Sequence, residues 1–207
     1  MEFKSKIKRI KDPDTSKELV ISNLYADKQM IEAHRQRLVN IFKNDTPQQI
    51  DQKISNIVIR DNVFNAAMNE IVKSYEINYD EEEISNAIVK IKPQFADASD
   101  EKLKNIAQKL IAKALIFRDL ADTWSITVSD QEVKESLQKF YMFSNEPIKP
   151  YLDDPIKFAN VRNVLLEEKI ATVILQKFKH RLDIKPTNPA PNNPDATKTA
   201  TDKNKIN

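Results

Sequence analysis

The amino-acid sequence predicts an all-α protein with an elongated multi-helix body and protruding helical arms. The 207 residues contain no glycine, on which two-residue hairpin turns and many β-bulges depend, so a strand-rich fold is not expected. Apolar residues recur instead at the i, i+3, i+4, i+7 spacing of helices. The ten prolines lie between these periodic segments or in the C-terminal tail, where they separate helices without interrupting them.

The first expected helices lie before residue 45. A less regular pattern indicates a helix near residues 16–25. Residues 27–43 follow as a clearer helix, because the side chains that suit a packed face recur there at helical spacing. These side chains belong to Met30, Ile31, His34, Leu38, Ile41 and Phe42.

A long helix is predicted to begin at residue 47. Thr46 is expected as its N-cap, Pro47 occupies the first helical position, and Gln49 completes a capping box. Apolar residues from Ile50 to Tyr75 then follow one face for about seven turns. A helix of this length outruns a single compact core, which is the reason for expecting an elongated body or a protruding arm.

Four further helices are expected, and each has a start signal. Glu83 and Glu132 are the capping-box partners expected for two of the N-caps. The helix at 100–125 has apolar residues on more than one side and is expected to be central, and the last helix shares this distribution. The N-caps and spans are Asp80 with 80–91, Ser99 with 100–125, Ser129 with 129–143, and Asp154, followed by Pro155, with 155–182.

The chain divides into three parts. Residues 1–15 form a basic arm that is expected to be flexible, and residues 16–185 form the helical domain. Residues 186–207 are rich in Pro, Asn, Thr and Lys and have no large apolar residue before Ile206, so a disordered tail is predicted. The arm is either a solvated leader or a contact for RNA or an anionic lipid surface, through Lys4, Lys6, Lys8, Arg9 and Lys11.

An internal helix-turn-helix repeat relates residues 71–88 to residues 120–137 at an offset of 49. In both copies a helix ends in an aromatic residue, an apolar–polar–apolar triplet follows, and a helix with a capping box begins. A fainter third copy ends before Pro186 and contains Phe178, Leu182 and Ile184. The pattern is explained either by one building block used repeatedly or by an ordinary helix turn with a hydrophobic staple. The matched positions are Ile71 with Leu120, Tyr75 with Trp124, Ile77 with Ile126, Tyr79 with Val128, and Ile84 with Val133.

Composition excludes several kinds of catalytic site. Without glycine the chain cannot form a Walker A loop, a dinucleotide-binding turn or a nucleophile elbow, and without cysteine it has no thiol chemistry. His34 and His180 are the two imidazoles in the sequence, so no metal site and no cofactor are expected. No apolar run approaches a membrane span, and no secretory signal is present, so a soluble cytoplasmic protein that is not an enzyme is expected.

Two groups of charged residues need a different explanation from catalysis. The acidic run Asp80–Glu83 lies at a predicted helix N-terminus, where the helix dipole and free amide groups favour negative charge. Lys169 has Leu166 and Leu165 at i−3 and i−4, so an intrahelical ion pair does not explain it. The net charge of +2 is too small for a dedicated nucleic-acid binder, so RNA binding is not the favoured function.

Two stretches resemble a known family. Residues 115–133, LIFRDLADTWSITVSDQEV, end one helix and open the next with an Ile-x-Val-Ser-Asp-x-Glu-Val run. Residues 151–155, YLDDP, are followed by VRNVLLEEKIATVIL at 161–175, with a Leu-Glu-Glu-Lys core. In both stretches the chain resembles the C-terminal chaperone domain of trigger factor, and the resemblance extends over about residues 45–185. The chain is also similar to the helical part of SurA-type periplasmic chaperones and to small uncharacterised mycoplasmal proteins of this build.

The resemblance implies a cradle of helical arms that holds unfolded or partly folded polypeptides without ATP. The ribosome-docking loop and the FKBP-like isomerase domain of trigger factor have no counterpart, so ribosome docking by that route and prolyl isomerisation are not implied. The alternatives are a structural or assembly protein that cradles one specific folded partner and a weak RNA-associated protein that uses the basic arm. Self-association is compatible with each of these functions.

Candidate binding residues cluster around three prolines between residues 140 and 158. The prolines prevent the apolar side chains from following one buried helix face, so some of them are expected to line an open groove for nonnative chains. The alternative is a loop held on the body by its own aromatic rings. The candidates are Phe140, Tyr141, Met142, Phe143, Ile148, Tyr151, Leu152 and Phe158, with Tyr25, Phe42, Phe64 and Tyr75 ranked lower because their helical spacing favours the core.

Overall fold

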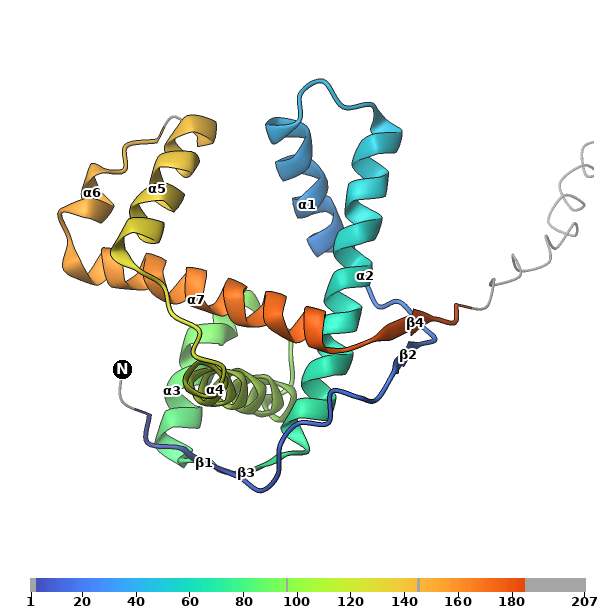
Figure 1. Cartoon of the computed structure of the whole chain (residues 1–207), viewed down its shortest axis with the longest axis vertical. Helices are drawn as coiled ribbons and strands as arrows, with labels where there is room; N and C mark the ends of the chain where they lie inside the picture. Colours follow the sequence, from blue (N-terminus) through green and yellow to red (C-terminus); the bar gives the residue numbers. More distant parts are fainter. Residues whose placement is uncertain (1–2, 96, 145, 185–207) are drawn as a thin grey trace, which may run out of the picture.

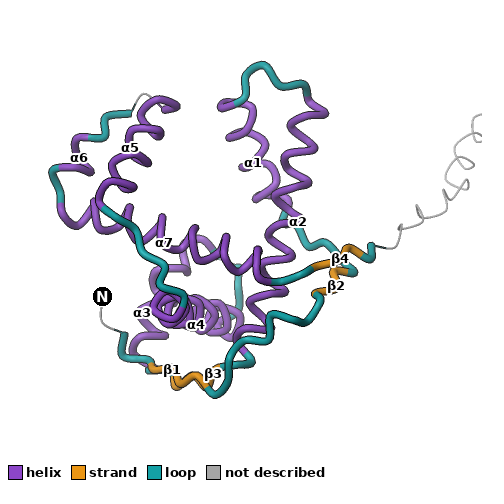
Figure 2. Tube along the Cα trace, in the orientation of Figure 1, coloured by secondary structure: helices purple, strands orange, loops and turns teal. Residues whose placement is uncertain are grey.

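Helices make up most of the fold, as the sequence predicts. The computed structural model describes residues 3–95, 97–144 and 146–184. In these residues the fold class is all-α, and the strands form two sheets of two strands each (Figure 2). The tail predicted at 186–207 lies outside the described residues.

The first arm consists of α1 (Lys28–Ile41) and α2 (Pro47–Val72), which pack side by side (Figure 1). The predicted capping box at Thr46 is confirmed: Gln49 N–H donates to Thr46 Oγ1 over 3.3 Å, and Thr46 N–H donates to Gln49 Oε1 over 2.7 Å. The 26 residues of α2 span about 39 Å, so the helix extends beyond the core into which its C-terminal half is packed. The arm expected from its length is present.

The body contains the hairpin of α3 (Glu81–Ile91) and α4 (Asp100–Thr123), joined through the short 3-10 helix η1 (Lys92–Gln94). The central position expected for α4 is confirmed, because α4 contributes to two hydrophobic clusters. Its first half packs with α3 around Leu103, and its second half packs with α2 and α7 around Leu120.

The second arm consists of α5 (Asp130–Ser144) and the short α6 (Lys149–Leu152), and both helices contact α7 (Pro155–Lys177). In Figure 1 this arm rises from one end of α7, and α2 passes the other end. Ile170 and Ile174 of α7 are buried in the core with α2 and α4. α7 therefore connects the two arms and is anchored by its C-terminal half.

The two sheets correct the predictions for both ends of the chain. β1 (Lys6–Arg9) pairs antiparallel with β3 (Tyr75–Asn78), and β2 (Leu19–Ile21) pairs parallel with β4 (His180–Leu182). The flexible arm expected for residues 1–15 is therefore wrong for residues 6–9. The helix expected near 16–25 is also wrong, because burial alternates along β2 with the period of a strand.

Pairing with the N-terminal strands also shortens two helices relative to the predictions. α2 ends at Val72 and not near Tyr75, and the last helix ends at Lys177 and not near Leu182. In each case the residues that follow the helix form a strand beside β1 or β2. The helical spacing of apolar residues continues through these residues. The local pattern therefore does not indicate that they pair with a strand from the N-terminal part of the chain.

Candidate functional site

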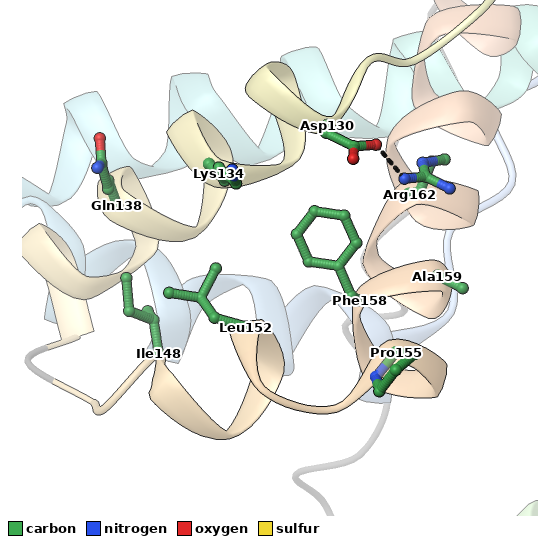
Figure 3. Close-up of a pocket in the computed structure, with 9 residues that line it drawn as sticks. All are labelled: Asp130, Lys134, Gln138, Ile148, Leu152, Pro155, Phe158, Ala159 and Arg162. Carbon is green, nitrogen blue, oxygen red and sulfur yellow. Dashed lines mark hydrogen bonds and ion pairs between the residues drawn. The ribbon is translucent and has the colours of Figure 1, made fainter.

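A hollow of about 540 Å³ lies between α5, α6 and the start of α7. Figure 3 shows Ile148, Leu152 and Phe158, three of the residues predicted from the sequence, pointing into this space. Prolines separate α5, α6 and α7, which explains how side chains so close in sequence can face one another across a hollow. Three of the predicted residues therefore line one open hollow.

The rim of this hollow is charged. Arg162 pairs with Asp130, and its guanidinium carbon lies 5.4 Å from the centroid of the Phe158 ring (Figure 3). Lys134 also lines the hollow and has no ion pair among the described residues. The hollow therefore combines an apolar floor with a positive side chain that is free to contact an incoming group.

The other predicted residues of this arm differ in exposure. Met142 is 81% exposed, and Phe140, Tyr141 and Leu152 are also exposed. Tyr151 is half-buried and lines a neighbouring hollow of about 370 Å³ beside α7. The predicted residue Phe143 has a side chain outside the described part of the chain. Ile156, at the start of α7, is 73% exposed and adds to this apolar surface.

The floor between the arms is a stripe along α7 that the sequence reasoning did not single out. The hollow beside Tyr151 shares Val164 and Glu168 with a further hollow of about 340 Å³ between α2, α4 and α7. The apolar residues of the last helix spread around its axis, but only one side of α7 is buried. The signal was present in the spacing of three and four residues along a second face, on which the apolar residues Val161, Val164, Ala171 and Leu175 lie with Glu168.

The lower-ranked candidates fall into two groups. Tyr25 is 79% exposed, and Phe42 is exposed at the end of α1. Phe64 is half-buried, lines the hollow beside α4, and meets the Phe117 ring edge-on at 6.2 Å between centroids. Tyr75 is 7% exposed, and its hydroxyl donates to Asp119 over 2.7 Å. Because its ring is buried, Tyr75 cannot contact a client. Burial and this carboxylate also raise the pKa of Tyr75 far above its usual range.

A buried amide fixes the base of the first arm. Asn62 of α2 accepts a hydrogen bond from Tyr25 N–H over 2.9 Å and donates to the carbonyl oxygens of Tyr25 and Val58 over 2.9 and 2.8 Å. All three hydrogen bonds of the side chain are made in a largely buried position. Asn62 therefore positions the segment that leads into α1 and presents the exposed Tyr25 ring.

The structure supplies the explanation for Lys169 that the sequence lacked. Lys169 Nζ donates to the carbonyl oxygen of Thr127 over 2.8 Å and to Glu132 over 2.5 Å, so its partners lie at the start of α5 and not on α7. Hydrogen bonds from Lys169 and then from Ser129 lower the pKa of Glu132 to about 2. With the pair of Arg162 and Asp130, this contact ties the first turn of α5 to α7.

The basic N-terminal segment is partly neutralised. Lys4 pairs with Glu82, and Arg9 pairs with Asp119 beside Tyr75. Two of the five basic residues offered for RNA contact are thereby held by acids of the same chain.

Within residues 3–95, 97–144 and 146–184 no cluster of three or more His, Cys, Asp or Glu side chains could hold a metal ion. None of the helices in that part of the chain is long and apolar enough to cross a membrane.

Comparison with known proteins places these features in a family context. Residues 94–176 match the family model of the bacterial trigger factor protein C-terminus, so the resemblance inferred from residues 115–133 and 151–175 is confirmed. The uncharacterized protein MG377 of Mycoplasma genitalium is 36% identical over 183 residues, which cover 88% of this chain and 95% of that protein. Its Mycoplasma pneumoniae homologue is 35% identical over the same shares of the two chains.

A solved structure shows the same architecture. The crystal structure of the hypothetical Mycoplasma protein MPN555 superposes with a TM-score of 0.76 at 34% sequence identity. The match covers 87% of this chain and 92% of that one. The arrangement of arms and body is therefore shared along nearly the whole length of both proteins.

Proposed function

The chain belongs to the family of the mycoplasmal protein MG377, with a trigger factor C-terminal region over residues 94–176, and from this premise we propose that it is an ATP-independent chaperone that holds nonnative polypeptides. The proposal places the client between the two arms, on the floor formed by α7. Fold similarity alone does not define a function, so the argument depends on the surface.

The observation that carries the proposal is the set of large apolar side chains left exposed on both arms. Soluble proteins seldom leave several such side chains close together unless they meet another molecule. Methionine and aromatic side chains suit variable partners because they offer large, adaptable apolar area. The exposed set comprises Tyr25, Met30 and Phe42 on or beside the first arm, and Phe140, Tyr141, Met142, Leu152 and Ile156 on or beside the second.

The surface favours weak and reversible binding. Burying one client side chain contributes about 1.5–3 kcal/mol, so four such side chains approximately offset an association cost of about 4–15 kcal/mol. The hollows are open and separate, and they present no single deep pocket within the described residues. Micromolar or weaker affinity follows, and a client can then leave to fold without ATP hydrolysis.

The test is suppression of aggregation of a chemically denatured protein on dilution. The chain is expected to suppress light scattering at near-stoichiometric ratio, and the triple variant Phe140→Ser, Tyr141→Ser, Met142→Ser is expected to lose most of this effect. Circular dichroism and thermal melting should change little, since these side chains are exposed. Val89→Ser, at an exposed apolar residue of α3 in the body, is the matched control and should keep full activity.

Two results would contradict the proposal. No suppression at several-fold excess of the wild-type chain excludes a general holding function. Recovery of one stoichiometric partner from cells, without a range of clients, favours the alternative of an assembly protein that cradles one folded partner. Our proposal assigns no catalytic residue and no cofactor.

A further inference from the structure

The two copies of the internal repeat differ in one respect that points to a second binding site. In the first copy, α2 leads into β3 and then α3, and β1 pairs with β3. In the second copy, α4 leads into residues 126–129 and then α5, and no strand pairs with these residues in the described part of the chain. Burial alternates in the same way along residues 77–79 and 126–128, so these side chains face the body alike.

In the first copy, β1 makes three kinds of contact. Ile10 N–H donates to the carbonyl oxygen of Ser74. In an antiparallel pair every second residue faces the partner strand with its N–H and carbonyl groups, so Asn78, four residues after Ser74 and opposite Lys6, also faces β1 with these groups. Ile7 lies opposite Ile77 and packs against both hydrophobic clusters.

The third contact replaces a capping box. Ser5 N–H donates to Glu83 over 2.9 Å, and Asp80 N–H donates to Ser5 Oγ over 2.9 Å, so Ser5, which directly precedes β1, takes the place of the box expected between Asp80 and Glu83. That expectation is thereby corrected. Asp80 still caps α3 through Glu83 N–H.

In the second copy, side chains of the body take the place of the strand. Thr127 corresponds to Asn78, and its carbonyl oxygen accepts from Lys169 Nζ, which also donates to Glu132, the counterpart of Glu83. The capping box closes on itself, because Ser129 N–H donates to Glu132 over 2.9 Å and Glu132 N–H donates to Ser129 Oγ over 3.3 Å. Groups that bind a strand in one copy thus bind a single ammonium group in the other.

The space beside this segment is open. A hollow of about 520 Å³ lies between residues 126–128, α5 and α7, and Ile126, Val128, Leu165 and Val173 line it. In the first copy the position opposite Ile77, the counterpart of Ile126, is filled by Ile7. The hollow is therefore placed to receive an aliphatic side chain from a strand that pairs with this segment.

The charges around the hollow favour a basic occupant. Glu135 and Glu168 line it and have no ion pair among the described residues, and Lys139 is the one unpaired cation there. The strand that occupies the matching position in the first copy has the sequence Lys6-Ile7-Lys8-Arg9, in which an aliphatic residue is flanked by cations. Replacing the Lys169 contacts by contacts with such a strand costs little free energy, because exposed ion pairs contribute little net stability.

We propose that residues 126–129 and the adjoining hollow bind an extended polypeptide strand in which an aliphatic residue is flanked by Lys or Arg, by strand addition at the edge that Lys169 covers. The site differs from the exposed apolar surface of the arms, and it goes beyond the proposed function because it selects clients by sequence. Loss of strand binding would leave suppression of aggregation through the arms intact.

The test measures fluorescence anisotropy of a labelled peptide with the sequence of residues 3–11, titrated with the full chain. Binding is expected, and two peptide variants should bind more weakly: Lys6→Pro, which removes a backbone N–H that faces the partner strand, and one with glutamate in place of every Lys and Arg. In the protein, Glu168→Lys should weaken binding about two- to fivefold by removing a carboxylate. Thr127→Pro should weaken it about two- to tenfold by removing an edge N–H.

Glu101→Lys is the matched control, since Glu101 is an exposed acid at the opposite end of α4. Its affinity should equal that of the wild type, and circular dichroism should show that every variant keeps its helices. Equal affinity of wild type, Thr127→Pro and Glu168→Lys would overturn the proposal. Tight competition by a peptide of residues 186–207 would also overturn it, because this chain's own tail would then be the occupant.

Discussion

The two arms contact the same helix, α7, but they are held in different ways. In the first arm, α1 has no buried residue and packs on α2, in which Ile50 and Ile54 are buried, while the buried amide of Asn62 holds its base. In the second arm, α5 buries Val133 and Leu137 where it packs on α7, and ion pairs hold its first turn. Ion pairs therefore act at different places in the two arms: Arg35 and Asp51 join α1 to α2 within the first arm, whereas the pairs of the second arm join α5 to α7.

The largest effect is expected from truncation of the apolar contact of the second arm. Leu137→Ala removes a side chain that is almost fully buried, and it should lower the free energy of unfolding by about 2–4 kcal/mol in urea denaturation. Leu110→Ala is the matched control because Leu110 is exposed on α4, and its midpoint should hardly move. If both variants have equal midpoints, α5 is not held by its apolar face.

The buried amide at the base of the first arm gives the next effect. Asn62→Ala leaves the backbone N–H and carbonyl of Tyr25 without their partner and should destabilise the chain by about 1–3 kcal/mol. Amide hydrogen exchange should accelerate in α1 more than in α5, because the segment around Tyr25 that Asn62 holds leads directly into α1. Asn56→Ala, at an exposed position on α2, is the control. Uniform acceleration across both arms would show that this amide does not act on the first arm alone.

The smallest effect is the pH dependence of the second arm. The contacts with Lys169 and Ser129 lower the pKa of Glu132 from an ordinary value of 4.5 to about 2. The stability that this carboxylate contributes is therefore complete above about pH 4.5 and is lost as the pH falls from 4.5 towards 2. The midpoint of urea unfolding, measured at several pH values, should fall less steeply over this interval in Glu132→Gln than in the wild type. Identical slopes would show that Glu132 does not link protonation to folding.

Much of the fold was predictable from local sequence. The N-caps at Thr46, Asp80, Ser99, Ser129 and Asp154 are confirmed, because capping chemistry is a local property. The strands were not predictable, because each pairs with a segment far along the chain. Residues near 16–25 and 178–182 show how tertiary pairing overrides a local helical pattern.

The candidate site was predictable only in part. The cluster around the prolines included Ile148, Leu152 and Phe158, three of the residues that line the hollow in Figure 3, because proline breaks reveal where apolar side chains leave a common face. The exposed ring of Tyr25 and the buried ring of Tyr75 were ranked alike, since each lies at an apolar position with helical spacing. The stripe on α7 was not singled out because periodicity does not show which of two apolar faces meets the core.

The sequence by itself determined the helical class, the starts of the helices and the absence of glycine- and cysteine-dependent chemistry, since these follow from residue types and their short-range spacing. Tertiary structure decided which apolar side chains remain exposed, which acids neutralise the N-terminal cations, and which copy of the repeat receives a strand. These outcomes depend on contacts between residues far apart in the chain, and such contacts have no signature in local periodicity. Lys169 illustrates the point, because its partners, Thr127 and Glu132, lie just before and within the first turn of α5 and not on its own helix.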